Sequence, residues 1–396
     1  MTSINGASPE VIRASAMVRR YATPVPTVAV KPVRTRRSTP VKKAPARVIA
    51  LIPACNEEQW IGRVIVNLKR QTCPPSRIVV AANNCTDDTV EEAYLHGAAV
   101  ITMNESEHKK AGALNQALSC LLPSLQDEDY IFIQDADTLP VPGWLEAALE
   151  VTTKNPLAVV SGRYASPPTG WSMLRIVQEN EFARDGRSID RRQDQTRIVV
   201  GTSALFRVSI LRAVVAARVS GSLPGPSSAN VFSVRSITED YELTLAFKTL
   251  GVQTMSPRAC DAVTDVMETV PALWTQRIRW QRGAFTDLRT YGLNKTTGWY
   301  YASQLLGLLG MLTVVLIVAQ ISLVVIVYGK YAPSAVWLAT MPLFIAYRIL
   351  TVQRTGWKGM LLAGLMLPEM AYDFFRYGVY CTSVWKAITR TETKWG

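Results

Sequence analysis

Two carboxylates, Asp135 and Asp137, directly follow a short apolar run, Tyr130–Ile133. Such a run is typical of a buried strand in a parallel sheet. Open α/β sheets bind their ligands at the carboxyl ends of the strands, and carboxylate oxygens there suit a hard cation such as Mg²⁺ or Mn²⁺. A lone Asp-x-Asp is more often only an acidic turn, so the rest of the chain must decide.

Strands and helices are expected to alternate before this point. Apolar runs predict strands at residues 47–51, 77–82 and 98–102, and periodic patterns predict helices after residue 58, at 89–96 and from 109 to about 122. This order favours a parallel, doubly wound sheet. The unusual polar residues fall just after the strands, at the edge where such sheets bind ligands.

The composition excludes several classes of protein. The net charge is +12 over 396 residues, but ten Lys/Arg and one Glu lie in residues 1–47, so the basic charge belongs mainly to a Pro-rich tail that we expect to be disordered. Attraction to anionic lipid and simple solvation both remain open for that tail. Two histidines make a His-based zinc site or a Ser-His-Asp triad improbable, and six cysteines without a C-x-x-C pair favour reduced thiols.

Several motifs resemble, in their order, the family 2 glycosyltransferases with the GT-A fold. They are IPACNEE from Ile52, NNCTDDT from Asn83, KAGALNQAL from Lys110, QDADT from Gln134, GTSALFR from Gly201, TED from Thr238 and QRIRW from Gln276. The last motif, with the apolar runs after it, points to the membrane-embedded branch that includes cellulose, hyaluronan, chitin and poly-N-acetylglucosamine synthases. The resemblance implies an α/β catalytic domain, with a mixed and mainly parallel sheet, followed by a helical membrane region.

The resemblance also assigns residues to a nucleotide sugar donor. It places Asp137 on a Mg²⁺ or Mn²⁺ ion that bridges the diphosphate, where the cation offsets the charge of the leaving group. Asn83 stands where the family usually has the Asp that receives the N–H of uracil; an amide oxygen accepts the same bond, but it is uncharged. We therefore expect a UDP-sugar. The donor-binding residues are Pro53, Ala54, Glu57, Asn83, Asp87, Lys110, Asp135, Gln276 and Arg279.

On the acceptor side the resemblance implies an inverting transfer with Asp240 as general base. Asp240 and Glu239 lie in the predicted helix 237–250, whose positive end favours an ionised carboxylate. Arg279 joins them as the third catalytic residue, since its guanidinium can clamp diphosphate oxygens. Gly201, Thr202 and Trp280 are the expected acceptor contacts. Without the other motifs, a plain N-cap box is the better explanation of the first segment. The second segment also suits an amphipathic membrane-surface helix, and this is compatible with its role in the site.

The chain is expected to have three parts: a basic tail at 1–46, the catalytic domain at 47–295 and a membrane region at 296–396. Uncharged runs predict spans at about 302–328 and 331–348, and we expect 359–385 to be interfacial or re-entrant because it contains Glu369, Asp373 and Arg376. Two spans leave the catalytic domain and the C-terminal Lys/Arg on one side. The positive-inside rule makes that side cytoplasmic, in a plasma or inner membrane.

The expected partners are a nucleotide sugar, the bilayer and a glycan, lipid or protein acceptor; no nucleic acid is expected. Two spans make a small channel for a single chain, so transfer of one or a few sugars is the alternative to polymer synthesis. A catalytically degenerate nucleotide-sugar-binding scaffold is the alternative from another class. A nucleic-acid-binding protein would show salt-dependent binding through residues 1–47, and a pyrophosphorylase would need a Gly-rich phosphate loop that is not apparent in this chain.

Overall fold

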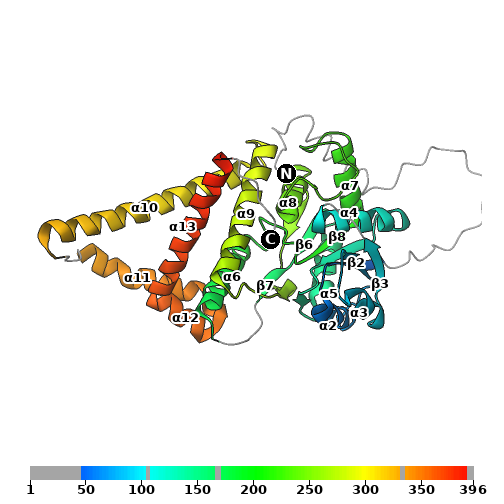
Figure 1. The fold of residues 1–396 in the computed structure, drawn as a ribbon, viewed down its shortest axis with the longest axis horizontal. Helices are drawn as coiled ribbons and strands as arrows, with labels where there is room; N and C mark the ends of the chain where they lie inside the picture. Colours follow the sequence, from blue (N-terminus) through cyan, green and yellow to red (C-terminus); the bar gives the residue numbers. More distant parts are fainter. Residues whose placement is uncertain (1–45, 104–107, 166–170, 331–334, 390–396) are drawn as a thin grey trace, which may run out of the picture. The chain divides into compact units, whose positions relative to one another are not determined.

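The computed structural model describes residues 46–103, 108–165, 171–330 and 335–389 (Figure 1). The expected basic tail, apart from Ala46, therefore lies outside the described residues. The chain divides into two compact units. Unit 1 comprises Met1–Arg163, Gln195–Val234 and Ala246–Val263, and unit 2 comprises Tyr164–Asp194, Arg235–Leu245 and Thr264–Gly396.

Unit 1 contains a seven-stranded sheet in the order β3-β2-β1-β4-β8-β6-β9. The first four of these strands run parallel to one another, as the alternation of strands and helices predicts. β8 is antiparallel to both β4 and β6, and β9 is parallel to β6. The expectation of a mixed, mainly parallel sheet is confirmed. The strands are β1 (Val48–Ala54), β2 (Arg77–Asn83), β3 (Ala99–Met103), β4 (Tyr130–Gln134), β6 (Ala158–Ser161), β8 (Ser203–Arg207) and β9 (Gln253–Met255).

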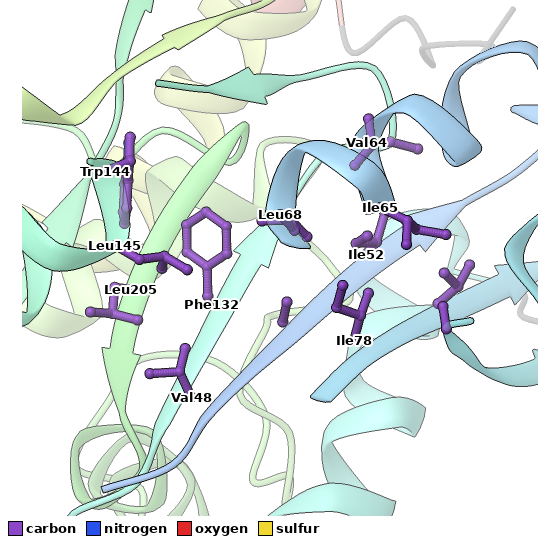
Figure 2. Packing of buried hydrophobic residues seen from close by; sticks show 14 of the residues in the cluster. Val48, Ile52, Val64, Ile65, Leu68, Ile78, Phe132, Trp144, Leu145 and Leu205 are labelled. Atoms are coloured by element: carbon purple, nitrogen blue, oxygen red, sulfur yellow. The ribbon is translucent and has the colours of Figure 1, made fainter. Parts of the chain in front are cut away.

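Helices cover both faces of this sheet. α2 (Glu58–Lys69), α3 (Thr89–Leu95) and α5 (Trp144–Lys154) share one hydrophobic core with alternate residues of β1, β2 and β4. In that core the Phe132 and Trp144 rings lie 4.7 Å apart (Figure 2). α4 (Lys109–Leu121) contacts β1 and β2 without joining this core, so it covers the opposite face. Both faces of β4 are thus buried, which explains why the strand is apolar without alternation.

Strand register gathers the ends of the strands at one edge. Ala54 of β1 lies opposite Ala82 of β2, so the residues after both strands emerge together. β8 runs antiparallel to β4 with Ser203 opposite Gln134, which places the start of β8 beside the end of β4. The segment that precedes Ser203 therefore meets the segment that follows Gln134.

Short elements complete unit 1. β5 (Leu139–Pro140) pairs with β10 (Asp261–Val263) in antiparallel fashion, and α7 (Val208–Val219) follows β8. Two 3-10 turns are η1 (Leu122–Ser124) and η2 (Arg258–Cys260). β7 (Arg163–Ala165) and α8 (Glu239–Thr249) cross the boundaries between the units.

Apart from the last two residues of β7, the regular elements of unit 2 are helices in its described residues. α13 packs along α9, and α12 packs on α6 and α11. These helices are α6 (Met173–Asp190), α9 (Val270–Tyr291), α10 (Gly298–Tyr328), α11 (Ala335–Thr351), α12 (Gly356–Leu365) and α13 (Leu367–Ile388), with the 3-10 turn η3 (Gln353–Thr355) before α12.

Within the described residues, α10 is the one helix that is long and apolar enough to cross a membrane. Its 31 residues exceed the roughly 20 that a span requires, and most of its large apolar side chains are exposed. α11, in the region of the expected second span, has 17 residues and contains Pro342; residues 331–334 lie outside the described part.

The region 359–385, expected to be interfacial or re-entrant, contains most of two helices, α12 and α13. Met366 adopts φ 61° between α12 and α13, and Pro368 is in the first turn of α13, where it needs no N–H partner. One of the charged residues of this region, Glu369, is buried in unit 2 and is 2% exposed. Arg184 and Arg348 both pair with Glu369 in unit 2, which offsets the desolvation of its charge.

Candidate functional site

The turn after β4 presents both carboxylates of the Asp-x-Asp motif. The buried Gln134 side chain donates to the Thr138 carbonyl at 2.6 Å, and the Thr138 amide donates to the Asp135 carbonyl at 3.3 Å. These bonds close the turn from its base. Asp135 and Asp137 remain partly exposed at its rim, where they can reach a ligand.

Asp135 connects three of the expected site residues. Its backbone amide donates to the Thr202 carbonyl at 3.0 Å, which follows from the antiparallel pairing of β8 with β4. Its Oδ1 receives the Lys110 ammonium at 2.5 Å, and the same ammonium lies 3.4 Å from the Gly201 carbonyl. Lys110 starts α4, while Gly201 and Thr202 precede β8, so three elements meet at this carboxylate.

Pro53, Ala54 and Glu57 lie at the carboxyl end of β1, where the chain turns into α2. The Glu57 amide donates to the Thr89 hydroxyl at 2.7 Å, which ties this turn to the start of α3. Burial, followed by the charges of Asp137, Asp135 and Asp87 in that order, raises the pKa of Glu57 to about 7. Four carboxyl groups therefore influence one another at this edge.

Asp87 is held by groups of the protein itself. It accepts the amide of Glu58 at 3.1 Å and the amide and hydroxyl of Thr89 at 3.1 and 2.5 Å. Burial by itself would raise the pKa of Asp87, but these hydrogen bonds favour the charged form and leave it below its usual value. Asp87 thus links the starts of α2 and α3.

Asn83, at the end of β2, is a buried polar side chain with an unused acceptor. It is 7% exposed, and its Oδ1 has no hydrogen-bond partner among the described residues. Buried acceptors are nearly always satisfied in native proteins. An amide oxygen in this state suits an N–H donor of a ligand, which is the role the sequence assigns to this position.

The metal ligands are few. Within the described residues no group of three or more His, Cys, Asp or Glu side chains is arranged to hold a metal ion. Asp137 accepts a hydrogen bond from the Thr138 hydroxyl at 3.1 Å, which leaves carboxylate lone pairs for a cation. Mg²⁺ in phosphate-transfer sites is held by one or two carboxylates together with substrate phosphates. The donor set therefore fits a cation that arrives with a diphosphate.

The expected catalytic carboxylates, Glu239 and Asp240, lie in unit 2. Glu239 and Asp240 occupy the first turn of α8, and both are partly exposed. Asp240 Oδ1 accepts the amide of Tyr241 at 2.8 Å, so the carboxylate sits at the positive end of the helix. This is the place that the sequence pattern predicts for it.

Gln276, Arg279 and Trp280 lie on α9, with Arg279 exposed and the other two partly buried. The Arg277 guanidinium stacks over the Trp280 ring, 4.6 Å from its centre, and also pairs with Glu181 at 2.7 Å. One face of Trp280 is thus occupied within unit 2.

Sequence reasoning missed three residues of α9 that hold α8 or the turn before it. Gly283, Asp287 and Tyr291 follow Arg279 at intervals of four, so the four residues share one helix face. The Tyr291 hydroxyl donates to the buried Glu242 of α8 at 2.7 Å. The spacing of four indicates that these residues share a helix face. The sequence does not show that α8 is the element that contacts this face.

Asn115, within the KAGALNQAL segment, was also left without a role. Its side chain donates to the Phe232 carbonyl and accepts from the Phe232 amide, both at 2.9 Å. Both residues are buried in unit 1. Asn115 thereby fixes the segment that leads towards Thr238.

Together, the sheet order and the ligand-binding edge define a GT-A-like α/β fold. Residues 49–215 match the family model for glycosyl transferase family 2, and the chain therefore contains a family 2 glycosyltransferase domain.

Individual known proteins are similar to this chain over different extents. The cellulose synthase catalytic subunit [UDP-forming] of Pseudomonas fluorescens (strain SBW25) is 24% identical over 264 residues, which cover 61% of this chain and 32% of that protein. The chain thus spans about a third of the length of this curated relative.

Among solved structures, the mannosyltransferase PcManGT from Pyrobaculum calidifontis in complex with GDP-Man and Mn²⁺ superposes with a TM-score of 0.52 at 19% identity, over 90% of this chain and 94% of that one. Glucosyl-3-phosphoglycerate synthase from Mycobacterium tuberculosis in complex with phosphoglyceric acid gives a TM-score of 0.41 at 16% identity, over 64% of this chain and 82% of that one. The first of these similarities supports the fold.

Proposed function

We propose that this protein is an inverting, metal-dependent glycosyltransferase that moves a sugar from a nucleotide diphosphate sugar to an acceptor hydroxyl at a membrane. The observation that carries the proposal is the family 2 domain with Asp135, Asp137 and Lys110 at its ligand-binding edge. A nucleotide diphosphate needs cationic partners, a sugar needs hydrogen-bonding partners, and this edge offers both.

Unit 1 is proposed to bind the donor. Asn83 accepts an N–H of the base, Lys110 donates to phosphate or sugar oxygens, and Asp135 faces the sugar or ribose. Asp137 holds Mg²⁺ or Mn²⁺, which when bound offsets the negative charge of the departing nucleoside diphosphate. We propose a UDP-sugar; because the amide of Asn83 is uncharged and can also donate, a guanine nucleotide is the second candidate.

Unit 2 is proposed to supply the base. The acceptor oxygen forms a bond to the anomeric carbon while the bond to the diphosphate breaks, and the hydroxyl proton passes to the Asp240 carboxylate. Arg279 stabilises charge on the diphosphate, Glu239 supports the same helix end, and Gly201, Thr202 and Trp280 contact the acceptor. One displacement of this kind inverts the configuration at the anomeric carbon.

We further propose that α10 anchors the protein in a plasma or inner membrane with the catalytic domain on the cytoplasmic side. The support is the exposed apolar surface of α10 and the cytosolic supply of nucleotide sugars. The acceptor is a glycan, a lipid or a protein, and the length of the product distinguishes polymer synthesis from transfer of one or a few sugars.

The deciding experiment measures turnover of UDP-, GDP- and other nucleotide sugars by the full chain in detergent, with Mn²⁺ or Mg²⁺ and a membrane extract as acceptor. Asp240→Asn should bind the donor but lose transfer by about a hundredfold or more, because a general base contributes 10²–10⁴-fold. Asp137→Ala should lose metal-dependent turnover.

Asp88→Asn is the matched control for both variants, since Asp88 is exposed and precedes α3 without capping it. It should behave as the wild type. Tight donor binding by the wild type without release of nucleoside diphosphate from any donor, across acceptor fractions and both metals, would overturn the enzyme in favour of a nucleotide-sugar-binding scaffold.

A further inference from the structure

A buried carboxylate on α9 holds the turn that precedes α8. Asp287 is 3% exposed, and its Oδ2 accepts the Ser236 hydroxyl at 2.8 Å and the Thr238 hydroxyl at 3.3 Å. The Ser236 hydroxyl oxygen in turn accepts the Thr238 amide at 3.1 Å. Two side-chain hydroxyls and one backbone amide are thus organised around a single carboxylate.

The same α9 face fits Thr238 closely at Gly283. A Cβ added at Gly283 would lie 2.1 Å from the Thr238 Oγ1 and 2.8 Å from its Cβ. Only glycine allows this approach, and it brings the backbone of α9 against Thr238 one turn before Asp287 contacts the same residue. Thr238 therefore contacts α9 at two successive turns of the helix, at Gly283 and at Asp287.

Fixing Thr238 fixes the start of α8. The amides of Tyr241 and Glu242 donate to the Thr238 carbonyl at 3.1 and 3.2 Å, so the first helical hydrogen bonds of α8 begin at this residue. Asp240 lies inside that turn. A shift of Thr238 therefore moves the Asp240 carboxylate, whereas the donor-binding groups of unit 1 are not involved.

We propose that Asp287 is a positioning residue that, through the hydroxyls of Ser236 and Thr238, fixes the first turn of α8 and thereby the place of the Asp240 carboxylate. The proposal rests on the function proposed above, because it is Asp240 as general base that makes this placement matter. Asp287 itself touches no reacting atom. Its effect is on the geometry of the acceptor side.

The charge state of Asp287 makes the proposal measurable. Burial is the largest cause that raises the pKa of Asp287; together with the charges of Glu242 and Asp240, and against the hydrogen bonds from Ser236 and Thr238, it brings this pKa to about 7. The Tyr241 hydroxyl also interacts electrostatically with the Asp287 carboxyl group. Because a carboxylate accepts stronger hydrogen bonds than a neutral acid, the turn should be held more firmly above pH 7 than below it.

The activity test compares Asp287→Asn with Thr286→Ala, a change at the exposed neighbour on α9 whose hydroxyl bonds only to its own helix. We expect kcat of Asp287→Asn at pH 8 to fall about tenfold to a hundredfold, as small misplacements of reacting groups do, with the donor KM unchanged. The wild type should lose kcat as the pH falls through about 7, and this limb should be absent from Asp287→Asn. Wild-type kcat and pH profile in Asp287→Asn would overturn the proposal.

A second test needs no substrate and so separates this inference from the proposed function. Hydrogen exchange of the 236–249 amides should be faster in Asp287→Ala and Thr238→Val than in Thr286→Ala. Gly283→Ala should show the same effect, because its Cβ displaces Thr238. Unchanged exchange in all three variants would overturn the positioning role even if the enzyme is active; faster exchange without turnover in the wild type would refute the enzyme alone.

The pH dependence of stability tests independently whether the pKa of Asp287 is raised. A carboxyl group with a raised pKa stays protonated in the folded protein while the unfolded chain loses that proton, so the free energy of unfolding falls as the pH rises from about 4 to about 7. Asp287→Asn has no titrating carboxyl group at this position and should not show this fall in the free energy of unfolding. Its melting temperature relative to the wild type should therefore increase between pH 5 and pH 8, and a constant difference would contradict the buried environment assigned to Asp287.

Discussion

The Lys110 ammonium lies 2.5 Å from the Asp135 carboxylate, and both side chains stay partly exposed, at 30% and 28%. The pair joins the start of α4 to the end of β4. Because an ammonium has three donors, Lys110 can keep Asp135 and the Gly201 carbonyl while it turns a donor towards an anionic ligand. Although Lys110 is paired with Asp135, it can therefore still donate to a diphosphate at this edge of the sheet.

Lys110→Met should weaken nucleotide sugar binding by about tenfold to a hundredfold, the value of one hydrogen bond to a charged group. The methionine keeps most of the apolar length of the side chain and removes the ammonium with its charge and donors. Titration calorimetry in the presence of Mn²⁺ measures the change. Lys109→Met, at the exposed neighbour, is the control, and equal affinities for the two variants would contradict the role of Lys110.

Asn115→Asp should destabilise the protein by about 1–3 kcal/mol, because the carboxylate cannot donate to the Phe232 carbonyl and leaves a buried acceptor without its partner. Thermal unfolding measures the loss. Gln116→Glu makes the same chemical change at the exposed neighbouring position and should have little effect. If both variants melt together, the Asn115–Phe232 pair contributes nothing to the fold.

The Asp129 carboxylate should support the sheet in a pH-dependent way. It accepts the backbone amide and guanidinium of Arg47 at 2.9 and 2.7 Å and the Gln126 amide at 2.8 Å. Burial would raise the pKa of Asp129, but these bonds outweigh it and lower the pKa.

A lowered pKa gives stability that is present above the ordinary Asp value near 4 and is lost as the pH falls below it. Asp129→Asn should therefore be less stable than the wild type at pH 6, and the difference should shrink towards pH 2.5. Urea denaturation at both pH values tests this; a difference that is independent of pH would exclude the carboxylate charge as the cause.

The double change Leu312→Lys and Leu316→Lys should release the protein from membranes. Each lysine near the centre of a span costs about 2.5–3.5 kcal/mol on insertion scales. Leu95→Lys with Leu293→Lys, at leucines that are 72% and 76% exposed outside α10, is the matched control. Carbonate extraction of membranes measures retention, and a wild type that is itself extracted would refute the proposed anchor.

The sequence alone was sufficient for the elements around Asp135 and Asp137. The apolar runs that became β1, β2 and β4 are local signals, and a parallel sheet brings the ends of its strands to one edge whatever the rest of the chain does. Asn83, Lys110 and Asp135, at or near the ends of strands and the start of a helix, could therefore be expected in one region, and the family resemblance gave them their roles. The break between α12 and α13 at Met366 could not be predicted from the sequence, because Pro368 fits either the start of a helix or an interruption within one.

Only the tertiary structure decided which distant groups hold the site in place. Asn115 bonds to Phe232 across 117 residues, Asp135 bonds to Thr202 through the antiparallel insertion of β8, and Asp287 reaches Thr238 because Gly283 lets two helices approach. Local periodicity determines which face of an element is apolar, but not which partner covers it. That choice depends on packing and on the pairing of buried polar groups over the whole unit, and it places Asp240 at the end of a helix held by α9.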